Sequence, residues 1–396
     1  MKRRSIWRNY NKPYVANHSA EWIQSGKKYY DRLVELIDSA QIEIHLQTYI
    51  FDDDSTGQII ADALIRAAQR KVGIYILIDA YGSQSMSQAF QSKLEAEGII
   101  VRRYGEFFSS GRFHISRRLH RKVMVIDAHT AVVGGINISD HYSGTEKQHA
   151  WLDFAIIITG QSCNRLEMIC RKRWKQIQFP KKTKTETKTG TKEKEVLVRV
   201  RRNDFIRNQN EIAISYRQAI RHAQKSLLFV GGYFLPGGRT RRLLRNAVRR
   251  GVEVSVLVAE KSDVGIMLSA RRYLYGWLTE NGIRVYEYQP ANVHGKVLIS
   301  DEQWSSIGSY DLNNLSTYSN IELNLDINDK VFSHSISKHI QHLIENESTE
   351  ITLQSTLLRR NIFVKFKCWF AYQFVKIMFV LSVVLAGKHE NREIKK

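Results

Sequence analysis

Cysteine is scarce in this chain of 396 residues. Its three cysteines, Cys163, Cys170 and Cys368, show neither a metal-binding spacing nor a disulfide framework. Cys163 and Cys170 lie seven positions apart on a predicted helix, where they share one buried face. This usage predicts a reducing compartment. Residues 1–15 are basic but contain no apolar core, so we expect no secretory signal.

Acidic residues are also few. The chain has 39 Asp and Glu against 60 Lys and Arg, which gives a formal net charge of +21. Such an excess indicates an anionic partner, either nucleic acid or an anionic membrane surface. The composition does not choose between them. The hydrophobic content of 43% is ordinary, and the length allows two domains with their own cores.

Long uncharged apolar runs are missing as well. Segment 362–387 is apolar and aromatic, but Lys365, Lys367 and Lys376 interrupt it. Its uncharged stretch, 377–387, has 11 residues, whereas a spanning helix needs about 20. The pattern favours a helix that lies in the membrane interface or enters it obliquely. A helix packed on the second domain is the alternative.

One stretch of the chain carries a candidate site. His120 and Lys122 stand two positions apart, four apolar residues follow, and Asp127 comes next. The apolar run predicts a buried strand, on which residues two apart share a face, so His120 and Lys122 point into one pocket. Asp127 has the opposite parity and is predicted to brace a loop. A Gly-Gly-x-Asn segment at 134–137 follows.

The chain then repeats this pattern. His294, Lys296 and Asp301 have the same spacing, and Gly308-Ser309 stands where the first copy has two glycines. Two copies of one pattern are difficult to explain by chance. We therefore expect the fold to bring both histidines to one site.

The flanking elements repeat too. Equivalent positions of the two copies lie 184 residues apart at Tyr49 and Tyr233 but 174 residues apart at the two histidines. The first copy therefore carries ten extra residues before its histidine. The pattern is that of a duplicated α/β unit. In the first copy it predicts a helix over 20–40, a strand over 42–50, a helix over 56–70 capped by Ser55, and further elements over 72–80, 86–97 and 99–104.

Two segments stand apart from the repeat. The insertion 105–118 borders the predicted pocket and combines aromatic with basic side chains, namely Phe107, Phe108, Phe113, Arg112, Arg117 and Arg118. It either dips into a lipid interface or is a solvated loop. Segment 180–195 lacks large apolar residues and is predicted to be a flexible linker. The expected organisation is a first unit over 1–179, this linker, a second unit over 196–346, and a basic, apolar, membrane-associating tail over 347–396.

Two histidines and two lysines at one point favour phosphoryl chemistry. One imidazole can attack phosphorus while the other protonates the leaving alkoxide, and the lysines neutralise the phosphoryl oxygens. An acceptor hydroxyl or water would then resolve the phosphohistidine. We expect no metal and no other cofactor. Asp153 and Glu322, each inside an apolar strand-like run, are candidates for holding the second histidine nitrogens, unless they are edge-strand carboxylates in water.

The duplicated motif resembles that of the phospholipase D superfamily. Residues 15–345 are similar to the shorter bacterial cardiolipin synthases. The resemblance implies an α/β fold of two similar α/β/α sandwich units about a pseudo-twofold axis, with the active site at their junction. It implies a nucleophile at His120, a general acid/base at His294, phosphate contacts at Lys122, Lys296 and Asn137, and histidine-orienting acids at Asp153 and Glu322. The expected catalytic set also includes the motif residues Asp127 and Asp301, and Ser309, Asp311 and Asn313 are expected to bind the phosphate or to orient the histidines.

The second copy departs from the family pattern after Ser309. Asp311 stands where the family usually has Asn, and Asn313 stands where it usually has Asp. A carboxylate facing a phosphodiester would repel it unless Lys296 or a proton compensates. Either the two side chains exchange roles or the handling of the acceptor is altered.

The resulting hypothesis is a phosphatidyltransferase that makes cardiolipin. Its partners would be anionic phospholipids, phosphatidylglycerol among them, and a membrane surface, with no nucleic acid. We expect it at the cell membrane, peripheral or monotopic on the cytoplasmic side. Hydrolysis by a phospholipase D, a nuclease of the same superfamily, and a binding protein with an inactive site are the alternatives. The oligomeric state stays open.

Overall fold

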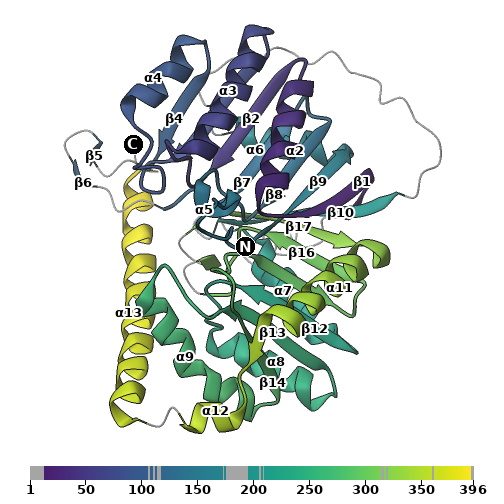
Figure 1. Ribbon diagram of the computed structural model, residues 1–396, viewed down its shortest axis with the longest axis vertical. Coiled ribbons are helices and arrows are strands. Elements are labelled where there is room, and N and C mark those ends of the chain that lie inside the picture. The colour runs from purple at the N-terminus through teal and green to yellow at the C-terminus, as the bar shows by residue number, and fades with distance from the viewer. Residues whose placement is uncertain are drawn as a thin grey trace.

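A computed structural model gives the architecture of the chain (Figure 1). Two α/β units lie one above the other, and a long C-terminal helix runs along one side of the second unit. The structure describes residues 13–105, 108–109, 112–113, 117–172, 174, 195–204, 207, 209–313, 316–317, 320–358 and 361–393.

The first unit follows the predicted order of strands and helices. Its elements are β1 (Val15–Gln24), α2 (Lys27–Ser39), β2 (Glu43–Thr48), α3 (Ser55–Gln69), β3 (Gly73–Asp79), α4 (Gln88–Ala96), β4 (Ile100–Tyr104), β5 (Phe108–Ser109), β6 (Arg112–Phe113), β7 (Lys122–Ile126), β8 (Thr130–Gly134), α5 (Asp140–Ser143), β9 (Phe154–Gly160) and α6 (Gln161–Arg171).

Two local predictions in this unit are wrong. The helix expected over 20–40 begins only at Lys27, because the preceding residues form β1 and pair with β9. Gly26, with φ +120°, separates the two elements. The cap of α3 is Asp54 rather than Ser55, since the Asp54 carboxylate accepts the Gly57 N–H at 2.8 Å. Propensity alone does not reveal a strand whose partner is more than a hundred residues away.

The second unit repeats this order and adds a C-terminal extension. Its elements are β10 (Val196–Asp204), β11 (Gln209–Asn210), α7 (Glu211–His222), β12 (Ser226–Gly231), α8 (Gly238–Arg249), β13 (Glu253–Ala259), α9 (Gly265–Glu280), β14 (Ile283–Tyr288), β15 (Lys296–Ser300), β16 (Trp304–Gly308), β17 (Glu322–Asn328), α11 (Lys330–Glu347), β18 (Ser348–Glu350), α12 (Leu353–Leu358) and α13 (Ile362–Glu393). The predicted linker 180–195, apart from Glu195, lies outside the described residues, as do the side chains of the insertion from 106 to 116.

The strand order shows the duplication directly. Outward from the centre, the first unit runs β1-β9-β8-β7-β2-β3-β4 and the second runs β10-β17-β16-β15-β12-β13-β14. Corresponding strands occupy corresponding places. β1 and β10 pair antiparallel, so the two sheets join into one sheet of 16 strands across the junction. The predicted duplicated α/β fold is confirmed.

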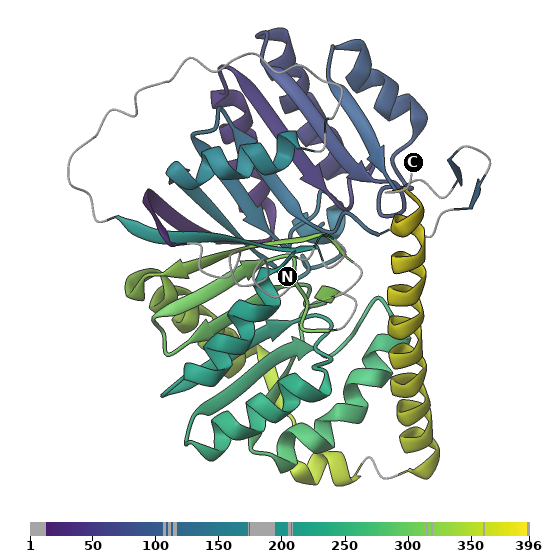
Figure 2. The ribbon, with the colours of Figure 1, turned by 180° about the vertical axis from the view of Figure 1, so that it is seen from behind.

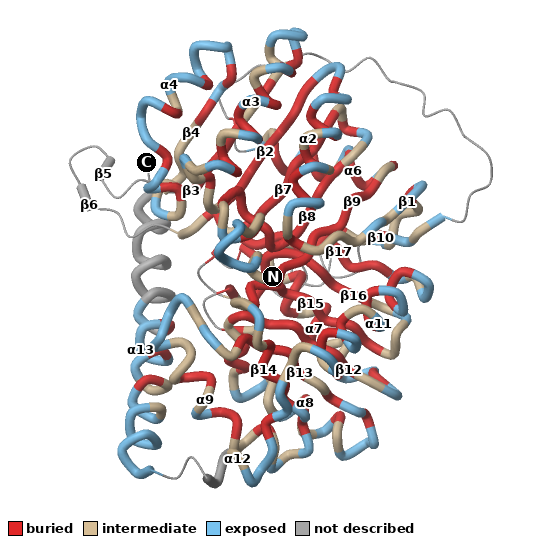
Figure 3. The backbone as a smooth tube through the Cα atoms, in the orientation of Figure 1, coloured by how far each residue is buried: buried red, intermediate tan, exposed pale blue. Residues whose placement is uncertain are grey.

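Helices cover both faces of this sheet (Figures 1 and 2). Helices α2, α3 and α4 form one core with the first unit, and α7, α8 and α9 form another with the second. A third core joins the units: Phe154 and Ile156 of β9 pack in one cluster with Leu323 of β17 and Ile336 of α11. Buried backbone accordingly concentrates at the centre (Figure 3). The two histidine segments are therefore held by a rigid, shared interior.

Helix α13 lies beside α9 (Figures 1 and 2). Ala371, Val375 and Phe379 are buried against the second unit, and the Tyr372 ring lies 5.0 Å from that of Tyr273. Within the described part of the chain, no helix combines the length and the unbroken apolar character required to cross a bilayer. The opposite face of α13 is exposed and is considered below with the function.

Candidate active site

The two histidines are positioned by the backbone of the opposite unit. His120 and His294 each stand two residues before a lysine that begins a central strand, β7 or β15. The His120 N–H donates to the carbonyl of Ile321 at 3.1 Å, and the His294 N–H donates to that of Leu152 at 2.8 Å. Each unit thus supplies the segment on which the other unit's histidine rests, so the site needs both halves of the chain.

The two acids also cross between the units. His120 Nδ1 lies 3.0 and 3.1 Å from the two carboxylate oxygens of Glu322, and His294 Nδ1 lies 2.7 Å from Asp153 Oδ2. The structure therefore brings both predicted acids to the histidines. The rings are 6.4 Å apart between centroids. With each Nδ1 engaged by an acid, Nε2 is the nitrogen that remains for chemistry.

Two buried lysines complete this group. Lys122 Nζ donates to the His120 carbonyl at 2.8 Å, and Lys296 Nζ donates to the His294 carbonyl. Burial and then repulsion from Lys296 lower the pKa of Lys122 to about 7. Bringing two buried ammonium groups to one place is costly without an anion between them. The arrangement is suited to a phosphoryl group.

The two acids differ in their electrostatics. Burial raises the pKa of Asp153 to about 7, against the opposing effect of Lys296. Burial also acts to raise the pKa of Glu322, but the attraction of His120 and hydrogen bonds from His120 and Ser309 outweigh it and leave that pKa below its usual value. Burial, followed by Lys296 and Lys122, lowers the pKa of His294 well below its usual range.

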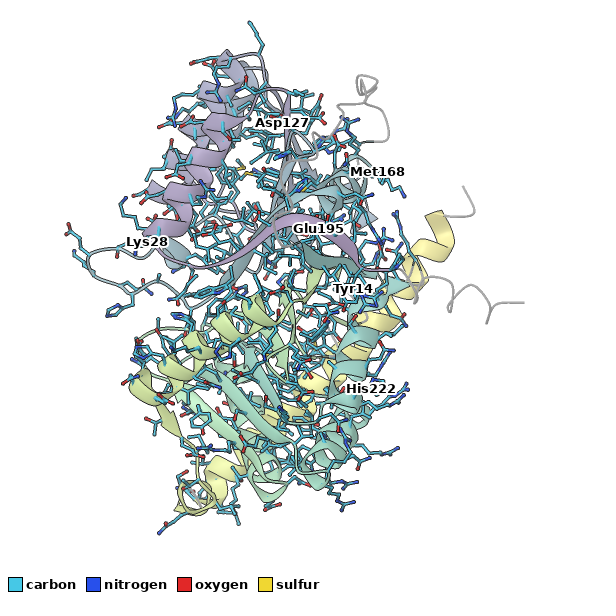
Figure 4. All side chains as sticks on the ribbon, turned by 90° about the vertical axis from the view of Figure 1, so that its right-hand side faces the viewer. Tyr14, Lys28, Asp127, Met168, Glu195 and His222 are labelled. Atoms are coloured by element: carbon cyan, nitrogen blue, oxygen red, sulfur yellow. The ribbon has the colours of Figure 1, made fainter. Side chains whose placement is uncertain are left out.

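The aspartates of the two motifs lie away from this group. Asp127 accepts the N–H groups of Gln41, Ile42 and Glu43, each at 2.8 Å. Asp301 accepts those of the matching positions 224–226 at 2.7 to 3.1 Å. Figure 4 shows Asp127 at the outer part of the first unit, distant from the junction. Both carboxylates fix the start of a neighbouring strand, as the parity of Asp127 predicts, and neither contacts the histidines.

Gly135, which follows Gly134, and Ser309, which follows Gly308, occupy equivalent positions and differ for a steric reason. A Cβ at Gly135 would lie within 2.6 Å of Asp153 Oδ2. Ser309, its counterpart, donates instead to Glu322 Oε2 at 2.5 Å. The first copy thus needs glycine to admit its acid, whereas the second uses a hydroxyl to hold its acid.

The predicted phosphate-contacting positions have partners inside the protein. Asn137 accepts the Ile50 N–H at 3.1 Å and donates to the Tyr142 hydroxyl at 2.8 Å. Asn313 accepts the Ser316 N–H at 2.9 Å. Asp311 is 3% exposed, and its Oδ1 lies 3.7 Å from Lys296 Nζ without a hydrogen-bond donor. Burial raises the pKa of Asp311, partly offset by Lys296. Direct contacts of Asn137 or Asn313 with phosphate stay predictions.

Sequence reasoning missed the aromatic side chains around the histidines. The Tyr49 ring lies 5.1 Å from that of His120. Tyr142, Trp151 and Tyr233 surround His294 at 5.3, 6.4 and 6.5 Å. The shared offset of Tyr49 and Tyr233 within the repeat is the signal that could have identified two of them. Asn320, which donates to Glu322 at 3.1 Å, had no such signal.

One group of potential metal ligands lies elsewhere. Among the described residues, Glu43, His45 and Glu167 bring three ligand atoms within 4.8 Å of one another. The Arg171 guanidinium already contacts both carboxylates, at 3.1 Å for Glu167. A cation is therefore in place, and this group serves the packing of α6 on the sheet rather than the histidine site.

Comparison with known proteins agrees with this architecture. The family model described as "Cardiolipin synthase, PLD-like domain" matches residues 33–174 and 216–344. Cardiolipin synthase B of Salmonella typhimurium is 31% identical over 366 residues, 89% of this chain and 87% of that protein. Cardiolipin synthase B of Escherichia coli K12 is 29% identical over 383 residues, 93% and 89% of the two chains.

A solved structure shares the fold. The phosphatidylserine synthase of Haemophilus influenzae superposes with a TM-score of 0.73 over 96% of this chain and 99% of that one, at 14% identity. Since the family model covers both units and their histidine motifs, the chain belongs to the cardiolipin synthase family of phospholipase D-like proteins.

Proposed function

We propose that this protein is a cardiolipin synthase-type phosphatidyltransferase. It transfers a phosphatidyl group from phosphatidylglycerol to the hydroxyl of a second phospholipid through a phosphohistidine intermediate. The family membership and the two relatives named cardiolipin synthase B support the reaction class. His120, His294, Lys122 and Lys296 are the residues that we propose to carry it.

The observation that carries the proposal is the crossed arrangement of two histidine–acid pairs around two buried lysines. Two imidazoles 6.4 Å apart can serve one phosphorus atom, one as nucleophile and one as proton donor. Lys122 and Lys296 supply positive charge where the phosphoryl oxygens gain negative charge. The chain's own side chains suffice for each of these roles.

The direct test is thin-layer chromatography of purified protein incubated with vesicles of labelled phosphatidylglycerol. We expect cardiolipin and free glycerol, and neither product with the H120A/H294A double variant. Phosphatidic acid as the only lipid product would show that water replaces the acceptor lipid. Cleavage of DNA or RNA without any lipid product would assign the protein to the nucleases of this fold.

We also propose that the exposed face of α13 attaches the protein to an anionic membrane. One stripe of this helix, spaced by three and four residues, points away from α9 and is 43 to 80% exposed; it consists of Phe363, Phe366, Phe370, Phe374, Ile377 and Leu381. Lys365, Lys367 and Lys376 lie on the same helix and are exposed outside this stripe. Exposed apolar and aromatic side chains together with lysines suit a helix lying in the plane of an anionic interface. The cytoplasmic side is the face that suits three free cysteines.

Vesicle co-sedimentation tests this attachment. F366E and F370E should each reduce binding to phosphatidylglycerol vesicles by at least tenfold, since a charge in the apolar stripe opposes insertion. M168E is the matched control, because Met168 on α6 is 55% exposed and lies outside the stripe. Vesicle binding by F366E and F370E equal to that of M168E would contradict the proposal.

A further inference from the structure

The two units differ in the charge of equivalent segments. Residues 28–68 of the first unit span most of α2, β2 and α3 and contain eight acidic and three basic side chains. The equivalent residues 212–252 of the second unit span α7, β12 and α8 and contain eight arginines, one lysine and no acid. Much of the positive charge of the chain is therefore concentrated on two neighbouring helices, α7 and α8.

Helix α8 carries the largest share of this charge. Arg242, Arg245 and Arg249 are spaced by three and four residues, which places them on one face of the helix, the arginine face. It is opposite Leu244 and Ala247, the buried residues of α8. Arg242 and Arg249 are exposed. Because like charges at this spacing destabilise a helix, the arginine face does not stabilise the fold by itself.

The arginines of α8 lack acidic partners. In the part of the chain that the structure describes, none of the six arginines between positions 239 and 250 forms an ion pair. The first unit differs in this respect. Arg32 of α2 pairs with Glu35 at 2.7 Å. Arg66 of α3, the helix equivalent to α8, pairs with Asp38 at 2.8 Å. The first unit thus neutralises these arginines internally, whereas those of α8 are left for an external anion.

Phosphate is the anion that this arrangement fits. A guanidinium group donates two parallel hydrogen bonds to one phosphate, which an ammonium group cannot do. A cavity of about 210 Å³ lies between α7 and the start of α8, and Arg217, Arg239 and Thr240 are among its lining residues. A phosphate headgroup can enter this cavity while others contact the arginine face.

Helix α9 connects α8 with the helix that we propose to attach the protein to the membrane. The Arg241 guanidinium of α8 lies 5.5 Å from the ring of Trp277 on α9. Tyr273 of α9 lies 5.0 Å from Tyr372 of α13. All three helices pack on one shared core. Nucleic acid also matches the charge, but the exposed apolar stripe of α13 in the same layer favours a lipid surface.

We propose that the arginine face of α8 binds the phosphate groups of anionic phospholipids in the bilayer. It is a second membrane contact, separate from the α13 stripe, and it makes attachment depend on lipid charge. The choice of phosphatidylglycerol as this lipid rests on the proposed function. Since the contact is electrostatic, salt weakens it, whereas salt affects the insertion of the apolar stripe far less.

Co-sedimentation of the full chain with vesicles tests this contact. R242Q/R249Q removes two charges from the arginine face, and the matched control R32Q/R66Q removes two charges from the first unit. The first variant should bind phosphatidylglycerol vesicles about tenfold to thirtyfold more weakly than the wild-type protein. The control should bind within about twofold of the wild-type protein, because charges far from the membrane are screened. At about 0.5 M NaCl the difference between the variants should disappear.

Two outcomes of this experiment would overturn the inference. One is equal vesicle binding by the two variants at low salt, with circular dichroism showing that both are folded. The other is weaker binding of duplex DNA by R242Q/R249Q with unchanged vesicle binding, which would assign the arginine face to nucleic acid.

A second experiment uses the wild-type protein and so does not depend on variant folding. Phenylglyoxal modifies accessible arginines, and mass spectrometry of the digested protein gives the extent at each position. Vesicles of phosphatidylglycerol, but not of phosphatidylcholine, should reduce modification of Arg242 and Arg249 roughly threefold or more relative to Arg32 and Arg66. Equal modification with both kinds of vesicle would overturn the inference. Both experiments measure binding without turnover, so absence of cardiolipin formation by the wild-type protein would overturn the proposed function alone.

Discussion

The two halves of the active site show how a duplicated unit loses its symmetry. Each half contributes a histidine, a lysine and an acid at equivalent strand positions, yet the first half holds Asp153 against Gly135 and the second holds Glu322 against Ser309. The longer acid gains hydrogen bonds that the shorter one lacks. One difference of a methylene group and one of a hydroxyl are enough to give the two acids different hydrogen-bond partners.

Changing the acids should have the largest effect. E322Q removes the carboxylate that holds His120 Nδ1 at 3.0 Å, and we expect kcat with phosphatidylglycerol to fall by about a thousandfold or more. D153N should lower kcat as well, because Asp153 Oδ2 holds His294 Nδ1 at 2.7 Å. An unchanged kcat in either variant would mean that its acid does not position a catalytic histidine.

Substitution at Gly135 should have the next largest effect. The Cβ of G135A would meet the Asp153 carboxylate within 2.6 Å, which displaces the acid from His294, so we expect a loss of about a hundredfold in kcat. S309A, the matched change, removes one hydrogen bond to Glu322 and should cost about tenfold. Initial rates on phosphatidylglycerol micelles, with circular dichroism to verify folding, measure both. A larger effect of S309A would contradict the steric argument.

The activity should depend on pH through the charge of Lys122. Because the pKa of Lys122 is lowered to about 7, its charge is present below that pH and is lost above it. We expect kcat/KM, which reports the free enzyme, to fall as pH rises above about 7. The corresponding decrease in kcat should occur at higher pH, because bound phosphate favours the charged form of Lys122. The donor is phosphatidyl-p-nitrophenol, whose leaving group needs no proton, so that loss of a general acid does not contribute. A flat kcat/KM up to pH 9 would exclude this role of Lys122.

Asp311 is a further difference between the halves, since its counterpart is Asn137. D311N removes a negative charge 3.7 Å from Lys296 and should lower KM for phosphatidylglycerol by roughly threefold to tenfold, with a smaller change in kcat. D31N, at an exposed aspartate of α2, is the control. An unchanged or raised KM would place Asp311 on the acceptor instead of the phosphate.

The smallest difference between halves is expected at the motif aspartates. Asp127 and Asp301 bind three backbone N–H groups each in the same way. D127N and D301N should each lower the free energy of unfolding by roughly 1–2 kcal/mol while the activity of the folded protein is retained. Thermal unfolding with residual activity measures this. Loss of activity without loss of stability would assign these residues a chemical role.

The local sequence determined a large part of this protein. Residue parity placed His120 with Lys122 and set Asp127 apart, because side chains alternate along a strand. The constant offset at Tyr49 and Tyr233 gave the duplicated order of elements. The cost of burying an unpaired carboxylate marked Asp153 and Glu322 inside apolar runs. Each of these inferences depends on a few neighbouring residues or on the repeat itself.

Only the tertiary structure decided which partners meet. That Glu322 holds His120 and Asp153 holds His294 follows from contacts over 202 and 141 residues. The strand β1, the use of Ser309 as a donor to Glu322, and the two apolar faces of α13, one on α9 and one exposed, likewise depend on where distant segments pack. A sequence fixes what each side chain can donate, accept or bury, but the closing of the two units onto one another decides which of these possibilities is realised.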